Sequence, residues 1–158
     1  MMFLRSTMNR LYRFGYVMLG ELATTRLFYS VHRGIYRLSH GRIFSRSVGC
    51  PVILLTTIGR KSGKSRTAPI FGFPEGQSIV VAPSNAGKEY YPAWYLNLRA
   101  NPLAQVQVGQ ETRHVKAREA TPEECERLWP CLITQYGGYQ FYRERTDRHI
   151  PIVILESV

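Results

Sequence analysis

PVILLTTIGRKSGKSRTAPIFGF, residues 51–73, contains two short apolar segments separated by a polar connection. Residues 51–56 are apolar and rich in β-branched side chains, and residues 66–73 repeat that pattern, which is typical of β-strands. The glycines and serines between the two segments are typical of turns. This part of the chain therefore predicts two strands joined by a turn.

The same strand pattern recurs on the C-terminal side of this hairpin. Helices are predicted between these strands, at residues 92–100 and 122–136. Few helices and six short strands predict an α+β, mainly β fold, built on a six-stranded antiparallel barrel and not on a doubly wound parallel sheet. The four further predicted strands are residues 78–82, 103–108, 111–118 and 150–155.

Two of these elements carry specific local signals. Thr121 is a typical N-cap residue, Pro122 suits the first helical position, and Glu124 completes a capping box. Gly137-Gly138 is expected to end that helix. Gly109-Gln110 predicts a hairpin, and the residues expected to be buried in it are Val106, Val108, Val115 and Ala117.

The N-terminal segment is predicted to be an amphipathic helix. Its longest apolar run, residues 14–20, is far shorter than the roughly 20 residues that a membrane span needs. Arg5, Asn9 and Arg13 lie opposite the apolar face. Such a helix either packs on its own domain or lies in the headgroup region of an anionic membrane. We therefore divide the chain into a basic leader, residues 1–40, and a barrel domain, residues 41–158. The apolar face of the leader comprises Leu4, Met8, Leu11, Phe14, Met18 and Leu22.

The charges of the chain are distributed unevenly. Residues 1–74 hold twelve Lys and Arg side chains and one carboxylate, Glu21, whereas residues 75–158 hold nine basic and ten acidic side chains. The basic part is expected to meet an anion, which could be a phosphorylated small molecule, a lipid headgroup or nucleic acid. Nucleic acid is disfavoured, because no recognition helix or aromatic RNA-binding motif accompanies the charge.

Cysteine and histidine usage indicates a cytoplasmic protein without a metal centre. The three cysteines are an odd number and form no C-x-x-C pair, which fits a reducing compartment. The four histidines are scattered, and none has the spacing of a zinc ligand set. The cysteines are Cys50, Cys125 and Cys131.

The connection that follows residue 58 combines groups that suit a phosphate. It offers backbone N–H donors, hydroxyls and positive charge together. It is not a Walker loop, because the glycines are four residues apart and the lysine leads into a strand. The alternative is an ordinary solvated hairpin turn. The residues concerned are Gly59, Arg60, Lys61, Ser62, Gly63, Lys64 and Arg66.

Two further segments are candidates for holding a flat ligand. Trp94 and Asn97 are three residues apart and share a helix face, with the small polar loop from Ser84 preceding them. Tyr136, Tyr139 and Tyr142 are also spaced by three, which lines one edge of a helical turn with phenols. In both cases ordinary core packing is the alternative.

Together these segments resemble the deazaflavin-dependent nitroreductase and quinone reductase family. The resemblance covers about residues 41–156 and implies a split β-barrel, like that of FMN-binding split-barrel proteins. It also implies a cytosolic, often membrane-associated oxidoreductase that binds coenzyme F420, a flavin analogue carrying a phosphate and an oligoglutamate tail. The segments that carry the resemblance are LLTTIGRKSGKSRTAPI (54–70), PAWYLNLRANP (92–102), WP (129–130), residues 136–142 and TDRHIPIVILE (146–156).

The resemblance also implies roles for individual residues. Tyr136, Tyr139 and Tyr142 are the candidate catalytic residues, and Phe71 is the candidate substrate contact. Asn85 stands where relatives often have lysine, and Phe71 stands where some have tyrosine. The remaining candidate cofactor-binding residues are Thr57, Gly59, Arg60, Lys61, Ser62, Gly63, Arg66, Ala82, Ser84, Asn85, Trp94 and Asn97.

The expected reaction is transfer of a hydride from the reduced deazaflavin to a planar apolar acceptor such as a quinone, and nitro compounds are further candidates. One alternative is a protein that binds or sequesters the deazaflavin with little turnover. Another is an FMN-dependent oxidoreductase, which is disfavoured because FMN lacks the anionic tail that would use so many basic groups. The sequence predicts no oligomeric state.

Overall fold

The computed structural model of the chain describes Gly15 and residues 26–158. The helix predicted between Leu4 and Leu22 lies outside the described residues, apart from Gly15. The helices are α2 (Arg26–Leu38), α3 (Ala93–Ala100), α4 (Pro122–Gln135) and α5 (Gly138–Arg145), with a 3-10 turn η1 (Asn85–Gly87). The strands are β1 (Arg46–Ser47), β2 (Cys50–Ile58), β3 (Ser65–Phe71), β4 (Phe73–Glu75), β5 (Ser78–Val81), β6 (Leu103–Val108), β7 (Glu111–Glu119) and β8 (Val153–Ser157).

The described part of the chain has eight strands, and the prediction of six is corrected accordingly. β1 has two residues, too few to give a periodic pattern. The predicted strand 66–73 is divided at Gly72, where a Cβ atom would lie 2.7 Å from Cδ1 of Ile53, so the backbone packs directly on β2. The last strand begins at Val153 and not at residue 150, because Pro151 has no N–H to donate to a neighbouring strand.

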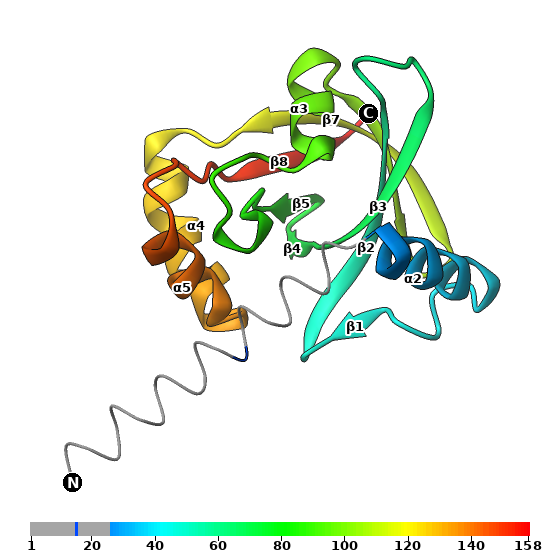
Figure 1. The fold of residues 1–158 in the computed structure, drawn as a ribbon, viewed down its shortest axis with the longest axis horizontal. Coiled ribbons are helices and arrows are strands. Elements are labelled where there is room, and N and C mark those ends of the chain that lie inside the picture. Colours follow the sequence, from blue (N-terminus) through cyan, green and yellow to red (C-terminus); the bar gives the residue numbers. More distant parts are fainter. Residues whose placement is uncertain (1–14, 16–25) are drawn as a thin grey trace, which may run out of the picture.

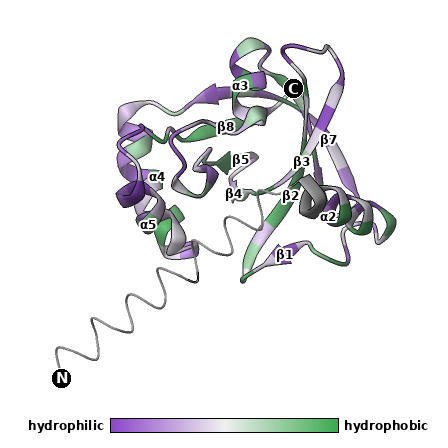
Figure 2. Cartoon of the chain, in the orientation of Figure 1, coloured by the Kyte–Doolittle hydropathy of each residue, from purple (hydrophilic) through white to green (hydrophobic). Residues whose placement is uncertain are grey.

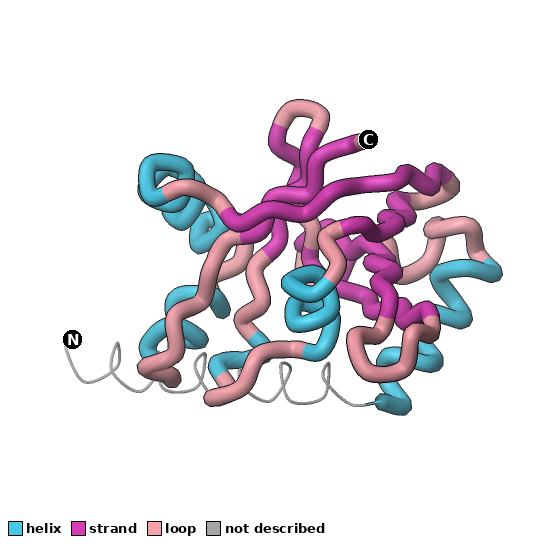
Figure 3. Tube along the Cα trace, turned by 90° about the horizontal axis from the view of Figure 1, so that it is seen from above, coloured by secondary structure: helices cyan, strands magenta, loops and turns pink. Residues whose placement is uncertain are grey.

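The strands form one antiparallel sheet in the order β1-β2-β6-β7-β8-β5-β4, and β3 also pairs with β2. The sheet curls, with α4 and α5 at one side and α2 at the other (Figure 1), and Figure 3 shows the same strands and helices from above. This curled antiparallel half-barrel with helices confirms the predicted mainly β, α+β architecture of split-barrel type.

Alternation along the strands divides the buried side chains between two cores. On β5, Ile79 and Val81 face the barrel interior, which α3 closes, whereas Val80 faces the core beneath α4 and α5. β8 follows the same rule, with Val153 inside and Ile154 outside. Strands buried on both faces are apolar throughout, which is why β8 is green along most of its length in Figure 2 while solvated β7 is largely hydrophilic.

Helix α2 is attached to the barrel through Tyr36, which is fully buried. The phenol donates to the carbonyl of Val52 at 3.2 Å and accepts from the N–H of Gly109 at 2.8 Å. The predicted leader, residues 1–40, therefore includes α2, a helix that is hydrogen-bonded to β2 and to the β6–β7 hairpin of the barrel. No helix within the described residues is both long and apolar enough to cross a bilayer.

Most of the local signals are confirmed: Val106 and Val115 are buried as predicted, whereas Ala117 is only half-buried. The Thr121 side chain accepts from the backbone of Glu124, whose carboxylate accepts from the Thr121 N–H, so the predicted capping box is present. The β6–β7 hairpin turns at residues 109–110 as expected. Val108 is exposed, however, which corrects its predicted burial: it lies at the tip of the hairpin, where the apolar alternation continues beyond the barrel core.

Candidate functional site

The connection between β2 and β3, residues 59–64, is here called the basic turn. The Gly59 N–H donates to the carbonyl of Lys64 at 2.9 Å, and the N–H groups of Ser62 and Gly63 both donate to the carbonyl of Gly59. The Lys64 N–H reaches the Ser62 hydroxyl at 3.4 Å. Most backbone donors of the turn are therefore used internally, which corrects the expectation that they are offered to a phosphate.

The basic turn is fixed to α3 by the side-chain amide of Asn97. Its Oδ1 accepts from the backbone N–H of Arg60 at 3.1 Å, and its Nδ2 donates to Oγ1 of Thr57 at 3.0 Å. Asn97 and Thr57 are both buried. Both ends of the amide are thus satisfied within the protein, and Asn97 positions the turn through its amide.

Anion binding at the turn depends on side chains. The side chains of Arg60, Lys61, Lys64 and Arg66 are all exposed, and none forms an ion pair with a carboxylate of the described residues. Arg66 pairs across the strands with Thr57, so it is on the Asn97 side of the hairpin. The structure therefore brings four unpaired cations together beside α3.

The second part of the site is the loop from β5 to α3, residues 82–91, here called the serine loop. Asn85, Ala86 and Gly87 are consecutive residues with positive φ, at 50°, 55° and 72°. Ser84 is a buried residue, and its side chain makes no capping hydrogen bond to η1. The Asn85 amide donates to the carbonyl of Tyr90 at 3.0 Å, so it stabilises the loop itself. The predicted contact of Ser84 with a ligand stays a prediction.

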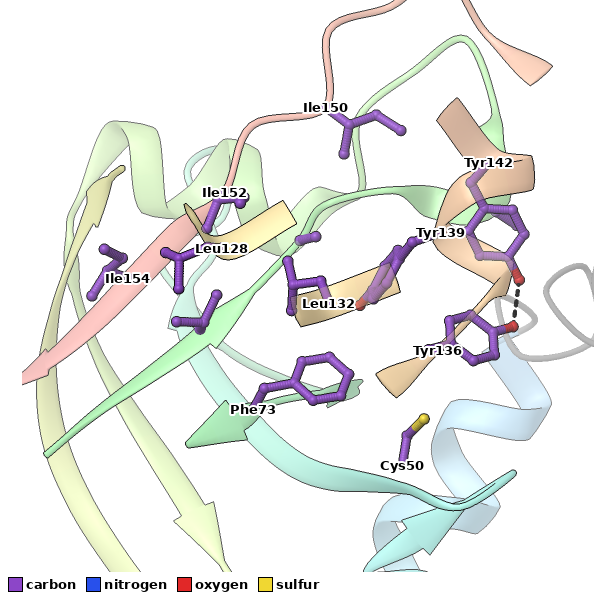
Figure 4. Close-up of a cluster of buried hydrophobic side chains, with 13 residues drawn as sticks. Cys50, Phe73, Leu128, Leu132, Tyr136, Tyr139, Tyr142, Ile150, Ile152 and Ile154 are labelled. Carbon is purple, nitrogen blue, oxygen red and sulfur yellow. Dashed lines mark hydrogen bonds between the residues drawn. The ribbon is translucent and has the colours of Figure 1, made fainter. Parts of the chain in front are cut away.

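The third part is the tyrosine cluster, formed by Tyr136, Tyr139 and Tyr142 (Figure 4) together with the partly buried Phe71 that packs against them. The hydroxyls of Tyr136 and Tyr142 are 2.9 Å apart, and the ring centroids of Phe71 and Tyr136 are 4.9 Å apart. All three tyrosines are buried. Burial raises the pKa of Tyr139 well above its usual value, with the nearby Cys50 as a smaller cause. The Tyr139 phenol therefore stays protonated throughout the physiological pH range.

The serine loop packs directly on α5. A Cβ atom on Gly87 would lie 2.9 Å from the carbonyl oxygen of Tyr142, closer than side chains tolerate. Ala86 belongs to the same core as the tyrosines, and its carbonyl accepts from Arg145 at 3.0 Å. The predicted residue Ala82 belongs to the same core as the predicted phenols, and Ser84 and Asn85 immediately precede the two residues that contact α5.

The structure places Trp94 apart from the tyrosine cluster. It is buried in the barrel interior with Tyr95 and Leu98, and its ring is edge-on to Tyr95 at 6.2 Å. Its proposed contact with a bound ring system stays a prediction. Arg145 and Arg148, which hold the serine loop, were not predicted to have a role, because isolated arginines some 60 residues distant in sequence give no periodic or motif signal.

The chain is similar to a family of known proteins. Residues 28–157 match the family model described as F420H(2)-dependent quinone reductase. A Mycobacterium tuberculosis protein named as an F420H(2)-dependent quinone reductase is 35% identical over 129 residues, 79% of this chain and 87% of that protein. A second protein of that organism, named as a putative member, is 36% identical over 105 residues, 66% of this chain and 88% of the relative.

Two solved structures are also similar. One, described as an F420-H2 dependent reductase, is 38% identical with a TM-score of 0.62, and the match covers 67% of this chain and 94% of that one. The other, described as a domain-swapped dimer, is 32% identical with a TM-score of 0.65, and the match covers 80% and 94% of the two chains.

We predict that Asn97→Ala will both destabilise the protein and weaken anion binding. The substitution leaves the Thr57 hydroxyl and the Arg60 N–H unpaired, at a cost of about 1–3 kcal/mol for each buried group. Urea unfolding and a titration with coenzyme F420 measure the two effects. Asn97→Asp keeps an acceptor for both groups, since the Thr57 hydroxyl can itself donate, but its buried negative charge opposes anion binding and should not restore affinity. Unchanged affinity in Asn97→Ala would contradict the role of Asn97.

Proposed function

The chain belongs to the F420H(2)-dependent quinone reductase family, and on that premise we propose that it transfers a hydride from reduced coenzyme F420 to a quinone-like acceptor. The observation that carries this assignment is the pairing of two unlike surfaces. Three cations on the basic turn and Arg66 at the start of β3, none with a carboxylate partner in the described part of the chain, stand beside α3, and the loop that leads into α3 packs on a buried cluster of phenols. The first surface suits an anionic tail and the second suits a flat apolar molecule.

The donor set fits the coenzyme's phosphate and glutamates. Arginine and lysine side chains form the strongest hydrogen bonds to such groups. Because the exposed cations have no carboxylate partners in the described part of the chain, no existing ion pair has to break before the coenzyme binds. Arg60, Lys61 and Arg66 would hold the tail, with Ser62 and Gly63 shaping the turn and Thr57 and Gly59 supporting its base. FMN has one phosphate and no glutamate tail, so it would leave most of this charge unused.

The ring system of the coenzyme would lie against the serine loop. Ala82 would provide an apolar contact, and the Ser84 hydroxyl, which caps no helix, would provide a hydrogen bond. The amide of Asn85 is already bonded to Tyr90, so this residue contributes through the backbone of the loop. When bound, the reduced deazaflavin supplies a hydride. The task of the protein is then to exclude water and to place the acceptor at roughly 3–3.5 Å from the ring.

The tyrosine cluster would form the acceptor side. Its rings are apolar on their faces, and Phe71 in place of a tyrosine extends that apolar surface next to Tyr136. A neutral phenol at Tyr139 donates a hydrogen bond to a quinone oxygen and does not become an anion. We assign the cluster chiefly a role in shaping the acceptor pocket. Quinones suit such a pocket, and nitro compounds of similar shape are secondary candidates.

Association with an anionic membrane surface is also part of the proposal. Exposed apolar side chains on α2 and the following loop include Val31, Leu38 and Phe44, and no carboxylate occurs between residues 22 and 74. An apolar surface beside arginines attracts anionic lipid. Such a position would bring the site close to acceptors that reside in lipid.

We expect removal of charge from the basic turn to weaken binding of coenzyme F420. Lys61→Gln with Arg66→Gln removes two charge-assisted contacts of roughly 1.5–3 kcal/mol each, which corresponds to a loss of about 100-fold or more in affinity. Cofactor fluorescence measures the dissociation constant. Arg113→Gln with Lys116→Gln on β7 is the control, because it removes the same net charge elsewhere. A dissociation constant equal to that of this control would exclude the turn as the tail site.

The tyrosines should affect turnover more than cofactor binding. Tyr136→Phe and Tyr139→Phe each keep the ring, so affinity for coenzyme F420 should stay within about threefold of the unsubstituted protein. Turnover with a soluble quinone should fall by less than about tenfold, as expected for a shaping role. Absorbance of the deazaflavin follows the reaction.

Larger effects would have distinct meanings. A loss of turnover of about 100-fold would contradict the shaping role and assign proton donation. Because the raised pKa keeps the Tyr139 phenol protonated, this group should produce no alkaline fall in rate between about pH 6 and 9. Equal loss of affinity in both variants would place the cluster on the cofactor side.

The membrane proposal is tested on the full chain. The protein should sediment with anionic phosphatidylglycerol vesicles at low salt and not with neutral phosphatidylcholine vesicles, because each arginine near an anionic surface contributes about 1 kcal/mol. Val31→Ser with Leu38→Ser should reduce the bound fraction and leave the rate with a soluble quinone unchanged. Absence of sedimentation with anionic vesicles at low salt would reject membrane association.

A further inference from the structure

Arg148 lies between α5 and β8 and binds several carbonyl groups of the serine loop. Its Nη2 donates to the carbonyl of Ser84 at 2.8 Å and to that of Pro83 at 3.3 Å, and its Nε donates to that of Lys88 at 3.0 Å. These carbonyls stand at the two ends of the segment 83–88, which contains η1. One planar guanidinium therefore joins both ends of the segment.

The position of Arg148 is itself fixed. Its guanidinium carbon lies 4.3 Å from the centre of the Tyr91 ring, and the Tyr91 hydroxyl donates to the carbonyl of His149 at 3.0 Å. The backbone N–H of Arg148 donates to the Thr146 hydroxyl at 3.1 Å. Tyr91 is at the far end of the serine loop, so contacts from Arg148 extend over the loop from Pro83 to Tyr91.

The segment that carries Arg148 continues directly from the helix of the tyrosine cluster. Tyr142 and Arg145 of α5 contact Gly87 and Ala86, and Arg148 follows three residues later. The loop between β5 and α3 and the segment between α5 and β8 lie side by side in Figure 1. Contacts from this one stretch, residues 142–148, therefore reach the start, the middle and the end of the serine loop.

We propose that Arg148 is a positioning residue that sets the Ser84 hydroxyl in register with the tyrosine cluster, an inference that rests on the proposed function for its catalytic consequence. Ala86 and Asn85 have positive φ values that side chains other than glycine adopt at a cost. Such a backbone persists only when its surroundings hold it in place, and Arg148 supplies that restraint. Displacement of Ser84 by about 1 Å is enough to reduce the rate of a reaction that depends on alignment.

The first test needs no cofactor. Amide hydrogen exchange is measured on the full chain for residues 83–91 in Arg148→Lys and Arg148→Met, with Arg113→Gln as a matched surface control. Lysine keeps the charge but cannot span the two ends of the segment. Both Arg148 variants should exchange about tenfold faster than the unsubstituted protein in this loop, while residues 59–64 are unchanged. Unaltered protection of residues 83–91 in folded Arg148→Met would overturn the proposal.

The second test measures catalysis. In Arg148→Lys the kcat with a soluble quinone should fall about 10- to 100-fold, while affinity for coenzyme F420 changes less than about threefold, because the basic turn still binds the tail. Guanidinium ion at low millimolar concentration should partly restore kcat in Arg148→Ala, whereas an equal concentration of sodium chloride should not. A kcat equal to that of Arg113→Gln would overturn the proposal.

The two tests separate this inference from the proposed function. If the unsubstituted protein binds no coenzyme F420, the proposed function fails, and the exchange measurement still decides whether Arg148 fixes the loop. If the unsubstituted protein turns over and the exchange of residues 83–91 is unaffected by Arg148→Met, the inference fails and the proposed function stands.

Discussion

The buried amide of Asn97 determines where the positive charge of this protein stands. It bonds the Thr57 hydroxyl at the end of β2 and the Arg60 N–H at the start of the basic turn. Without it, the turn would be a hairpin tip whose side chains could occupy many positions. Burying an amide is favourable only when its hydrogen bonds are made, so both partners are required for the helix to pack as it does.

The rest of the site follows from this attachment. The serine loop leads directly into α3, so fixing α3 against β2 also fixes one end of that loop. Its other contacts come from the stretch 142–148, through Gly87, Ala86 and Arg148. The result is a site with two environments. One is exposed and cationic, where charges act through water, and the other is buried and apolar, which would suit a flat molecule oriented by a few hydrogen bonds.

The sequence predicts those features that depend on local pattern. Alternating apolar residues indicate the paired strands, and Thr121, Pro122 and Glu124 identify the start of α4, because both signals act within a few residues. The division of the predicted strand at Gly72 depends on how closely β2 approaches, and the exposure of Val108 depends on where the barrel ends. A local sequence pattern contains neither kind of information. The resemblance supplies the grouping of the site residues. The structure places them in three parts, which are the basic turn bonded to α3, the serine loop packed on α5, and the tyrosine cluster.

The hydrogen-bond partners of the site residues could not be predicted, because polar groups that look available to a ligand bond to other parts of the protein. The donors of the basic turn look available to a phosphate in the sequence, yet the turn uses most of them to close on itself. Asn97 looks like a ligand contact but bonds the protein. Arg148 donates hydrogen bonds to backbone carbonyls some 60 residues away. Every residue has such a carbonyl, so the sequence contains no pattern that identifies these partners.

Comparing the binding of coenzyme F420 with that of FMN tests the central claim most directly. The full chain is titrated with each cofactor at low and at high salt, and binding is followed by fluorescence. The account predicts that coenzyme F420 binds far more tightly than FMN and that raised salt weakens this preference, because the difference lies in contacts between the anionic tail and the basic turn. Equal affinity for the two cofactors, or a preference for coenzyme F420 that does not respond to salt, would contradict it.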